Sequence, residues 1–376
     1  MAVKKKQFKL TSEQQEQIER KRQERIQKRD RSNGNGNGDT STNSERDFLD
    51  GFEQSIGVFG DASVANGEVG QIFDYHQGLL QLHLANVDGG AVKLMSHYVW
   101  NAALVMAEYI EAGDVLDVQK KRVIEFGAGA ALPGLLCAKR GAEFVTLTDY
   151  PDPAIVQNME RNWYENLAES AETKETRRIR NQESVHSAVY KELMDATDEQ
   201  AHSKRRAVEQ RVRCAVRGHA WGESVQEMLD CLPASDASLG PQSESNDTQH
   251  EQQVNQGYDI ILMADTLWVS EGHPGLLKSC LSVLKKGDRS TSGGRVFVCC
   301  GLHSGYNTVH RFLALAQSSE YGFRSRLVGI RRVPVWGDTR TAEELRRESE
   351  SLTEEDLDRF SVEDRNRTVL VYELTR

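Results

Sequence analysis

The sequence predicts an α/β protein with a seven-stranded, mostly parallel sheet, helices on both faces and a C-terminal antiparallel hairpin. Three observations support this fold class. Short, almost continuous apolar runs alternate with helical patterns, as in parallel strands buried on both faces. Two segments near the C-terminus alternate apolar and polar residues with a period of two. A glycine-rich turn follows the first apolar run and opens a helical pattern.

The elements follow one another in a regular order. Five apolar runs are predicted as the parallel strands: Arg122–Phe126, Phe144–Thr148, Arg213–Val216, Asp259–Ala264 and Arg295–Cys300. Helical patterns lie between or before them: Tyr98–Ala112, Pro133–Lys139, Pro153–Leu167 and Pro274–Lys286. The segments Phe323–Val333 and Thr368–Leu374 are predicted as the final antiparallel pair, which brings the sheet to seven strands.

Composition divides the chain into a domain and its additions. Residues 1–45 form a basic arm and a Gly/Asn/Ser linker, which we expect to be disordered. Residues 46–90 are expected to form a lid of short strands, and residues 91–376 the main domain. The highly charged segment 170–211 is interpreted as an inserted, solvated helix pair. The segment 234–256, which contains no Lys or Arg, is interpreted as an inserted loop.

Several classes of protein are disfavoured by composition. No apolar run approaches the roughly 20 residues that a transmembrane helix needs, and the charged start lacks the apolar region of a signal peptide. We therefore expect a cytoplasmic protein without membrane association. The six cysteines show neither disulfide nor zinc spacing and are interpreted as buried, reduced thiols. The ten histidines form no metal-binding motif, so no metal is assigned.

Charge is distributed unevenly along the chain. The net charge is −10, and the first 31 residues hold eleven Lys/Arg against five Asp/Glu, so this arm is +6 and the remainder is −16. An acidic body disfavours general nucleic-acid binding, which depends on neutralising phosphates. It suits a basic protein or a small cation as partner. We expect a monomer.

The strongest local motif is the turn after Arg122–Phe126. Gly127 and Gly129 allow the backbone to approach a ligand that any Cβ would exclude, and Pro133 favours a helix start. Such a turn also opens nicotinamide-binding domains, and it can occur without a ligand. A dinucleotide fingerprint requires a third glycine at the position of Leu132, which disfavours a pyrophosphate ligand.

An acidic residue ends the next strand. Asp149 lies twenty residues beyond Gly129, where a carboxylate can bind the ribose hydroxyls of an adenosine ligand. The alternative is that Asp149 caps the helix that begins near Pro153. The glycine turn and the acid together predict an adenosine-containing cofactor, without deciding between hydride and methyl transfer.

Four sequence segments favour one of these two reactions, because they resemble those of a known family. EFGAGAALPG, LTDYPDP, GHAWG and DIILMADTLW occur in this order and resemble the Rossmann-like, seven-strand methyltransferases of family 16. LTDYPDP, with Trp100-Asn101-Ala102 upstream, is similar to the fungal nicotinamide-N-methyltransferase-like subgroup, which includes protein N-terminal and lysine methyltransferases. The resemblance implies S-adenosylmethionine as cofactor and a protein amine, in elongation factor one-alpha, as acceptor.

The resemblance also implies roles for single residues around the cofactor. Gly127, Ala128 and Gly129 would line its methionine part with backbone groups. Glu125 would anchor its amino end, directly or through water, and Asp149 would hold the ribose.

Three further positions are implied to contact the cofactor. Trp221 would pack beside the adenine, and Ala264 would contact the cofactor at the end of the fourth strand. Trp100 would close the pocket from the preceding helix. For both tryptophans, plain core packing remains the alternative.

The catalytic positions follow the fourth strand. Asp265 occupies the place of a family acid, and it would orient the acceptor amine or take its proton. Trp268 occupies the place of a Tyr or Phe in relatives and would stack on the acceptor. The alternative for Asp265 is a capping role after the strand. Nicotinamide methylation, a non-catalytic cofactor-binding module and another adenosine-ligand enzyme remain alternative functions.

Overall fold

The computed structural model describes residues 65–67, 70–85, 98–168, 199–233, 257–287, 293–334 and 340–376. The predicted basic arm and linker, the loop insert 234–256 and most of the insert 170–211 lie outside these residues. None of the helices in the described part has the length and apolar character that crossing a bilayer requires.

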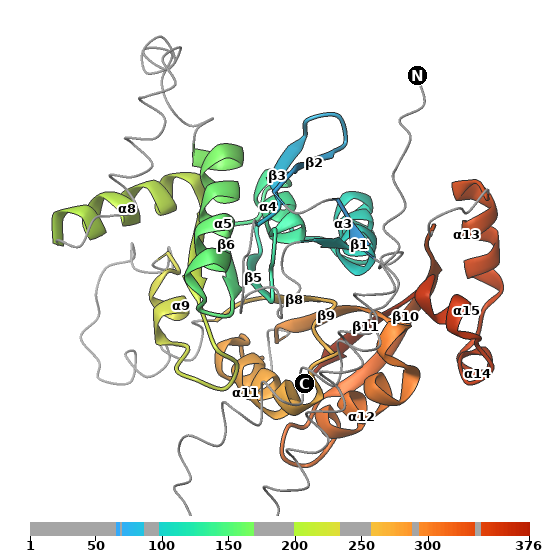
Figure 1. Cartoon of the computed structure of the whole chain (residues 1–376). Coiled ribbons are helices and arrows are strands. Elements are labelled where there is room, and N and C mark those ends of the chain that lie inside the picture. Colours follow the sequence, from blue (N-terminus) through green and yellow to red (C-terminus); the bar gives the residue numbers. More distant parts are fainter. Residues whose placement is uncertain are drawn as a thin grey trace, which may run out of the picture. The chain divides into compact units, whose positions relative to one another are not determined.

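One seven-stranded sheet organises the described residues (Figure 1). Its order is β10-β11-β9-β8-β5-β6-β7, and the five strands from β9 to β7 are mutually parallel. β11 is antiparallel to both of its neighbours, which confirms the predicted mixed sheet and the antiparallel C-terminal pair. The strands are β5 (Arg122–Phe126), β6 (Phe144–Asp149), β7 (Cys214–Gly218), β8 (Ile260–Ala264), β9 (Arg295–Gly301), β10 (Arg324–Arg332) and β11 (Thr368–Thr375).

The direction of strand addition reverses at β5. From β5 the chain adds β6 and then β7 toward one edge, whereas β8 and β9 are added on the other side of β5. In open α/β sheets, ligands bind outside the carboxyl ends of the strands at such a switch point. We therefore expect a ligand site at the carboxyl ends of β5, β6 and β8.

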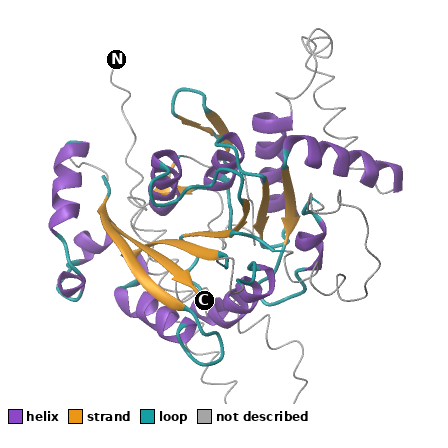
Figure 2. Ribbon diagram, turned by 180° about the vertical axis from the view of Figure 1, so that it is seen from behind, coloured by secondary structure: helices purple, strands orange, loops and turns teal. Residues whose placement is uncertain are grey.

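Helices cover both faces of the sheet (Figure 2). α3 (Asn101–Ala112), α4 (Leu132–Lys139) and α5 (Pro153–Trp163) pack on one face. α9 (Gln226–Asp230), α11 (His273–Val283) and α12 (Tyr306–Ala316) pack on the other. Because successive strand residues point to opposite faces, the apolar runs supply both cores. This explains why the strands lack polar alternation.

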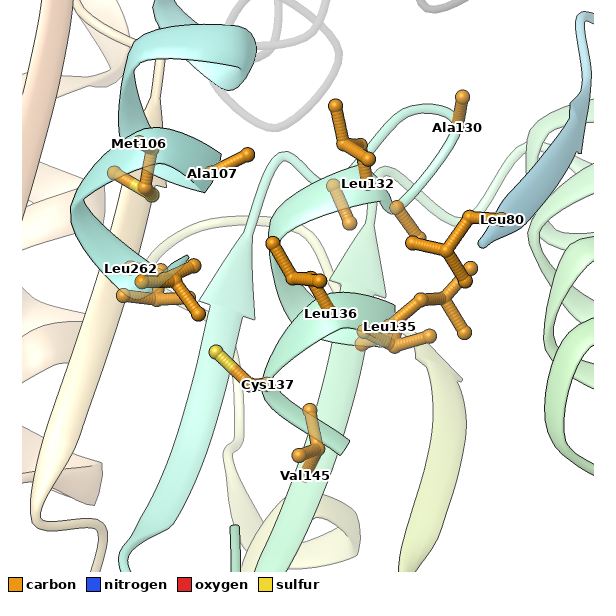
Figure 3. Packing of buried hydrophobic residues seen from close by; sticks show 14 of the residues in the cluster. Leu80, Met106, Ala107, Ala130, Leu132, Leu135, Leu136, Cys137, Val145 and Leu262 are labelled. Atoms are coloured by element: carbon orange, nitrogen blue, oxygen red, sulfur yellow. The ribbon is translucent and has the colours of Figure 1, made fainter. Parts of the chain in front are cut away.

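The helix after the glycine turn is buried on almost all sides. Figure 3 shows α4 between Met106 of α3 and Leu80 of β3 (Leu80–His83), with Val145 of β6 beneath it. Leu135 and Leu136 of α4 are fully buried in this cluster. The glycine turn is thus attached to a helix that cannot shift without opening the core.

Short strands precede the sheet in the described part of the chain, and the interpretation of residues 46–90 as a lid stays a prediction. β1 (Ala65–Asn66) pairs with β4 (Val99–Trp100), and β2 (Ile72–Tyr75) pairs with β3. The helix predicted from Tyr98 begins instead at Asn101, because Val99 and Trp100 pair with β1. Trp100 is thereby fixed immediately before the helix.

A row of asparagine amides joins β3 to α5 and its π-helical extension η3 (Tyr164–Ala168). Asn158, Asn162 and Asn166 are spaced by four residues and therefore share one helix face. Asn162 accepts a hydrogen bond from the His83 amide at 2.7 Å, and Asn166 accepts one from the Gln81 amide at 2.9 Å. The same side chains donate to the carbonyls of β3, so they satisfy its free edge as a strand would.

The described part of the first insert is a helix that is largely exposed to solvent, as its composition suggests, but it carries one buried acid. In α8 (Glu199–Val212), Arg205 binds Glu160 of α5 at 2.6 Å. Glu209, which is almost fully buried, binds both Arg205 at 3.0 Å and Arg217 of β7 at 2.7 Å. Only Glu160 is distant in sequence from its partner, whereas Arg205 and Glu209 form an i,i+4 pair that a helical charge pattern can indicate.

Three helices between the last two strands were not predicted. α13 (Ala342–Ser351), α14 (Glu354–Leu357) and α15 (Val362–Asn366) connect β10 to β11. Thr341 with Glu344, Thr353 with Asp356, and Ser361 with Asp364 form capping boxes at the three helix starts. This Ser/Thr-x-x-acid spacing is a sequence signal that could have identified all three helices.

Candidate functional site

The glycine turn after β5 adopts a conformation that side chains disfavour. Gly127 and Gly129 have φ angles of 66° and 54°, in the left-handed region. A Cβ on Gly127 would lie 2.8 Å from Cγ2 of Thr266, which follows β8. The Ala128 amide donates to the Thr148 carbonyl at 2.9 Å, which ties the turn to β6. The turn therefore presents backbone, without side chains at two positions, between β5 and β8.

Asp149 at the end of β6 is bound to this turn. Its Oδ2 accepts a hydrogen bond from the Gly129 amide at 2.7 Å, and its Oδ1 accepts one from the Tyr150 amide at 2.7 Å. Burial raises the pKa of Asp149 to about 6, against the effect of these two hydrogen bonds. The capping alternative is wrong, since Asp152 caps α5 by accepting from the Ala154 amide at 2.8 Å.

Glu125 is buried in β5, two residues before Gly127 of the glycine turn. Its Oε2 accepts a hydrogen bond from the Gly134 amide in α4 at 2.8 Å, and a Cβ on Gly134 would lie 2.6 Å from that oxygen. Burial raises the pKa of Glu125 to about 8; the Gly134 amide opposes this rise and Asp149 adds to it. The carboxyl group thus holds the first turn of α4 against β5, and its contact with a cofactor stays a prediction.

The loop after β7 brings Trp221 to the glycine turn. A Cβ on Gly127 would lie 3.7 Å from Cζ2 of this ring, and one on Gly272 would lie 2.9 Å from Cε3. The Ser279 hydroxyl of α11 accepts a hydrogen bond from the Gly222 amide at 2.8 Å and lies 2.9 Å from Nε2 of His219. The half-buried indole is therefore held between the turn and α11.

Asp265 follows β8 in a left-handed conformation, with a φ angle of 58°. Its amide donates to the Cys299 carbonyl at 2.8 Å, and its Oδ1 accepts from the Gly301 amide at 3.1 Å. Burial raises the pKa of Asp265, and His303 and the Gly301 amide oppose this rise. The capping alternative is wrong, because the next helices are capped by Val269 and Gly272 without a side-chain hydrogen bond.

An imidazole lies beside this carboxylate, and an indole stacks on that imidazole. Trp100 is half-buried, and its ring stacks on His303 with centroids 5.6 Å apart. His303 lies in the short helix η7 (Leu302–Ser304) after β9, and its Nε2 is 3.7 Å from Oδ1 of Asp265. The sequence places His303 near a strand end without a role. Ala264 and Trp268, on either side of Asp265 in sequence, are both half-buried.

A buried hydroxyl supports the fit of an adenosine-type cofactor. Oγ1 of Thr266 is buried and has no hydrogen-bond partner among the described residues, although a buried hydroxyl normally has one. The methyl group of the same side chain packs against Gly127, which places Thr266 next to the glycine turn. The donor set around it contains glycine amides and the Asp149 carboxylate, which are groups suited to an amino acid and a ribose.

The described residues contain no cluster of three His, Cys, Asp or Glu side chains suited to a metal ion. All six cysteines are buried and free, which confirms the interpretation as buried thiols.

Comparisons with known proteins find methyltransferases. A family profile described as lysine methyltransferase, methyltransferase family 16, matches residues 82–195. The protein N-terminal and lysine N-methyltransferase efm7 of Schizosaccharomyces pombe is 29% identical over 191 residues, 51% of each chain. The Yarrowia lipolytica protein of the same name is 26% identical over 256 residues, 67% of this chain and 74% of that protein.

Among solved structures, a putative SAM-dependent methyltransferase from Streptococcus mutans has a TM-score of 0.42 at 9% identity, covering 83% of this chain and 57% of that chain. The match to the S. pombe relative spans about half of that protein's length. Over residues 82–195 the chain is similar to the lysine methyltransferases of family 16, and its sequence relatives are named protein N-terminal and lysine N-methyltransferases.

Proposed function

We propose that the protein is an S-adenosylmethionine-dependent N-methyltransferase that acts on a protein lysine or N-terminal amine. One observation carries the proposal: the glycine turn, Asp149 and Asp265 converge at the carboxyl ends of β5, β6 and β8. Thr266 links the two halves, because it follows Asp265 and its methyl group lies beside Gly127.

The cofactor-binding roles follow from position. Backbone groups of Gly127, Ala128 and Gly129 would bind the methionine part, since the two glycines carry no side chain of their own. Asp149 would accept hydrogen bonds from both ribose hydroxyls with the lone pairs that the Gly129 and Tyr150 amides leave available. Trp221 would lie against the adenine.

The remaining positions would shape the site. Trp100 and Ala264 would border the methyl-donor end, beside Asp265. Glu125 would act from beneath the turn by holding α4, because its carboxyl group already binds the Gly134 amide.

Reaction chemistry assigns different tasks to cofactor and protein. S-adenosylmethionine supplies a methyl group on a sulfonium, which is already activated for displacement. The protein therefore has to position the acceptor, exclude water and remove a proton from an ammonium acceptor, because an ammonium has no lone pair. Asp265 would bind and deprotonate the amine, and Trp268 would stack beside it.

The presence of a buried carboxylate favours an amine over nicotinamide as acceptor. A pyridine nitrogen carries no proton at neutral pH and needs no base, whereas a lysine ammonium with a pKa near ~10.4 does. The names of the relatives and the acidic body of the chain also support a basic protein acceptor. Elongation factor one-alpha, which the sequence resemblance implies, is the first acceptor to test.

The direct test is transfer of tritium from methyl-labelled S-adenosylmethionine. The protein is incubated with the labelled cofactor and, in parallel reactions, a yeast lysate, purified elongation factor one-alpha and nicotinamide. We expect label in protein, stable to acid precipitation, and its loss in D265N. Label in nicotinamide alone would contradict the protein acceptor, and no label in any reaction would contradict the proposed activity.

A further inference from the structure

Three contacts from β9 and the turn that follows it converge on Asp265. The Cys299 carbonyl accepts from the Asp265 amide, and the Gly301 amide donates to Oδ1. The His303 imidazole lies 3.7 Å from the same oxygen. Oδ2 makes no hydrogen bond with the described residues, so the carboxylate has one held oxygen and one oxygen left for a ligand.

The position of the imidazole is itself determined by packing. One face of His303 stacks on Trp100 at an interplanar angle of 24°. Gly301 leaves the space that the ring needs, since a Cβ there would lie 2.6 Å from Nδ1 of His303 and 3.4 Å from Oδ1 of Asp265. The ring is almost completely buried, which strengthens its electrostatic effect on a neighbouring carboxylate.

We infer that His303 is a positioning residue for methyl transfer, which holds Asp265 ionised and oriented so that Oδ2 receives the proton of the acceptor amine. This inference rests on the proposed function. In the step, the N–H bond of the acceptor ammonium breaks and an O–H bond forms at Oδ2. The carboxylate becomes a neutral acid, and the amine keeps the electron pair with which it attacks the methyl carbon. As the N–C bond forms, the methyl–sulfur bond of the donor would break and its electron pair would stay on the sulfur.

Other ionisable groups around the pair do not replace this interaction. Burial raises the pKa of the Cys299 and Cys300 thiols of β9, and the nearby Asp265 adds to this rise, which keeps both thiols neutral. The phenol of Tyr98 lies beyond Trp100. From α15, the guanidinium of Arg365 approaches the end of η7. Neither thiol supplies a negative charge and the guanidinium is a cation, so among the described residues Asp265 is the carboxylate that lies beside the imidazole.

Burial and His303 act on Asp265 in opposite directions. Burial raises the pKa of Asp265, and His303 lowers it. Without the imidazole, the carboxylate would become protonated at a higher pH and would lose its capacity to accept a proton there. A purely packing role for His303 would leave this titration unchanged.

The first test is a titration that does not depend on activity. Full-length protein is labelled with carboxyl-¹³C aspartate, and the Asp265 resonance is identified by its absence in D265N. H303F retains a ring that can stack on Trp100 but removes both nitrogens. H310F, at an exposed histidine of α12, is the matched control.

We expect the pKa of Asp265 to be higher in H303F than in the wild type and in H310F. H303Q, which keeps a hydrogen-bond donor but cannot become charged, serves if H303F does not fold, and the same upward direction is expected. An unchanged Asp265 titration in the folded variant would overturn the inference.

The second test is the pH profile of kcat/KM with S-adenosylmethionine and purified elongation factor one-alpha. In H303F, the acid limb should move to higher pH, and kcat/KM at the acid end should fall by about tenfold, while H310F follows the wild type. The same acid limb in H303F and the wild type would overturn the positioning role. No transfer by the wild type to any protein would overturn the proposed function, and the catalytic part of this inference with it, whatever the Asp265 titration shows.

Discussion

Three carboxyl groups lie buried near the ends of β5, β6 and β8, and their hydrogen bonds distinguish them. Glu125 binds an amide of α4, Asp149 binds the glycine turn, and Asp265 binds the end of β9. Burial raises the pKa of all three. Carboxyl groups with raised pKa values gather at functional sites, because a shifted pKa suits proton transfer near neutral pH.

We predict that substitution of Asp149 lowers the free energy of cofactor binding by more than it lowers the free energy of unfolding. D149N removes the negative charge that would bind the ribose hydroxyls, but it keeps one oxygen for the turn's amides. The Kd for S-adenosylhomocysteine, measured by calorimetry, should rise at least about tenfold, since a hydrogen bond to a charged group contributes roughly 1.5–3 kcal/mol.

Asp152 provides the matched control for that experiment. D152A removes the cap of α5, so it should lower the free energy of unfolding by about 1 kcal/mol without changing cofactor affinity. Equal affinities for D149N and the wild type would remove Asp149 from the cofactor site.

At Glu125, we predict a pH-dependent contribution to stability. The pKa is raised from 4.5 to about 8 in the folded state, so the protonated form is favoured by folding. This stability is fully present below pH 4.5 and is lost as the pH rises through about 8.

E125Q should mimic the neutral acid and lose this dependence. In urea unfolding, the free energy of unfolding of E125Q minus that of the wild type should increase as the pH rises from 4.5 to about 8. Above that pH the difference should stay constant. Each pKa unit corresponds to about 1.4 kcal/mol. A difference between the two proteins that does not change with pH would contradict a raised Glu125 pKa.

Among the elements, the join between β3 and α5 depends on one fully buried side chain. Asn162 binds both backbone groups of His83 and also donates to the Ala130 carbonyl of the glycine turn at 3.1 Å. N162A should lower the free energy of unfolding by at least about 2 kcal/mol, because each buried group left without a partner costs roughly 1–3 kcal/mol.

Asn158 is the control for this element. Its amide makes one hydrogen bond, to the His83 carbonyl at 2.9 Å, and it is only half-buried, so N158A should cost less. Hydrogen exchange at the His83 amide should accelerate in N162A but not in N158A. Equal stability losses in the two variants would show that the buried join is not centred on Asn162.

The elements that sequence predicts well are those defined locally. β5, β6 and β8 are continuous apolar runs, and the glycine turn has a motif, so the order of residues is enough to identify them. The capped helices after β10 were missed because their polar sequence lacks an apolar face. Neither the position of β11 between β9 and β10 nor the burial of Glu209 is a local property.

The candidate site also contains residues that a local sequence pattern identifies and residues that it does not. Asp149 and Asp265 end strands and follow motifs, so the sequence identifies them. His303 and Thr266 acquire their significance from contacts between the ends of neighbouring strands, which a linear pattern does not display. The sequence therefore indicates the two candidate acids, which belong to motifs. It does not indicate the side chains that lie beside them in space.

For the molecule as a whole, charge should govern the encounter with its acceptor. The net charge of the chain is −10. The first 31 residues carry +6, so the remaining residues carry −16. A basic protein acceptor should therefore associate faster at low salt, since complementary charge steers encounter and salt screens it.

We predict that kcat/KM for elongation factor one-alpha falls as sodium chloride rises from low to physiological concentration. The affinity for S-adenosylhomocysteine, which carries no net charge at neutral pH, should change little and serves as the control. A salt-independent kcat/KM would contradict electrostatic steering by the acidic body.

The measurement that tests the central claim most directly is a calorimetric titration of the full-length protein with S-adenosylhomocysteine and, separately, with NAD. The glycine turn, Asp149 and the absence of a third glycine at Leu132 predict saturable binding of S-adenosylhomocysteine to one site per chain and no binding of NAD. Saturable NAD binding without any heat from S-adenosylhomocysteine would contradict a methyl-donor site at the ends of β5, β6 and β8.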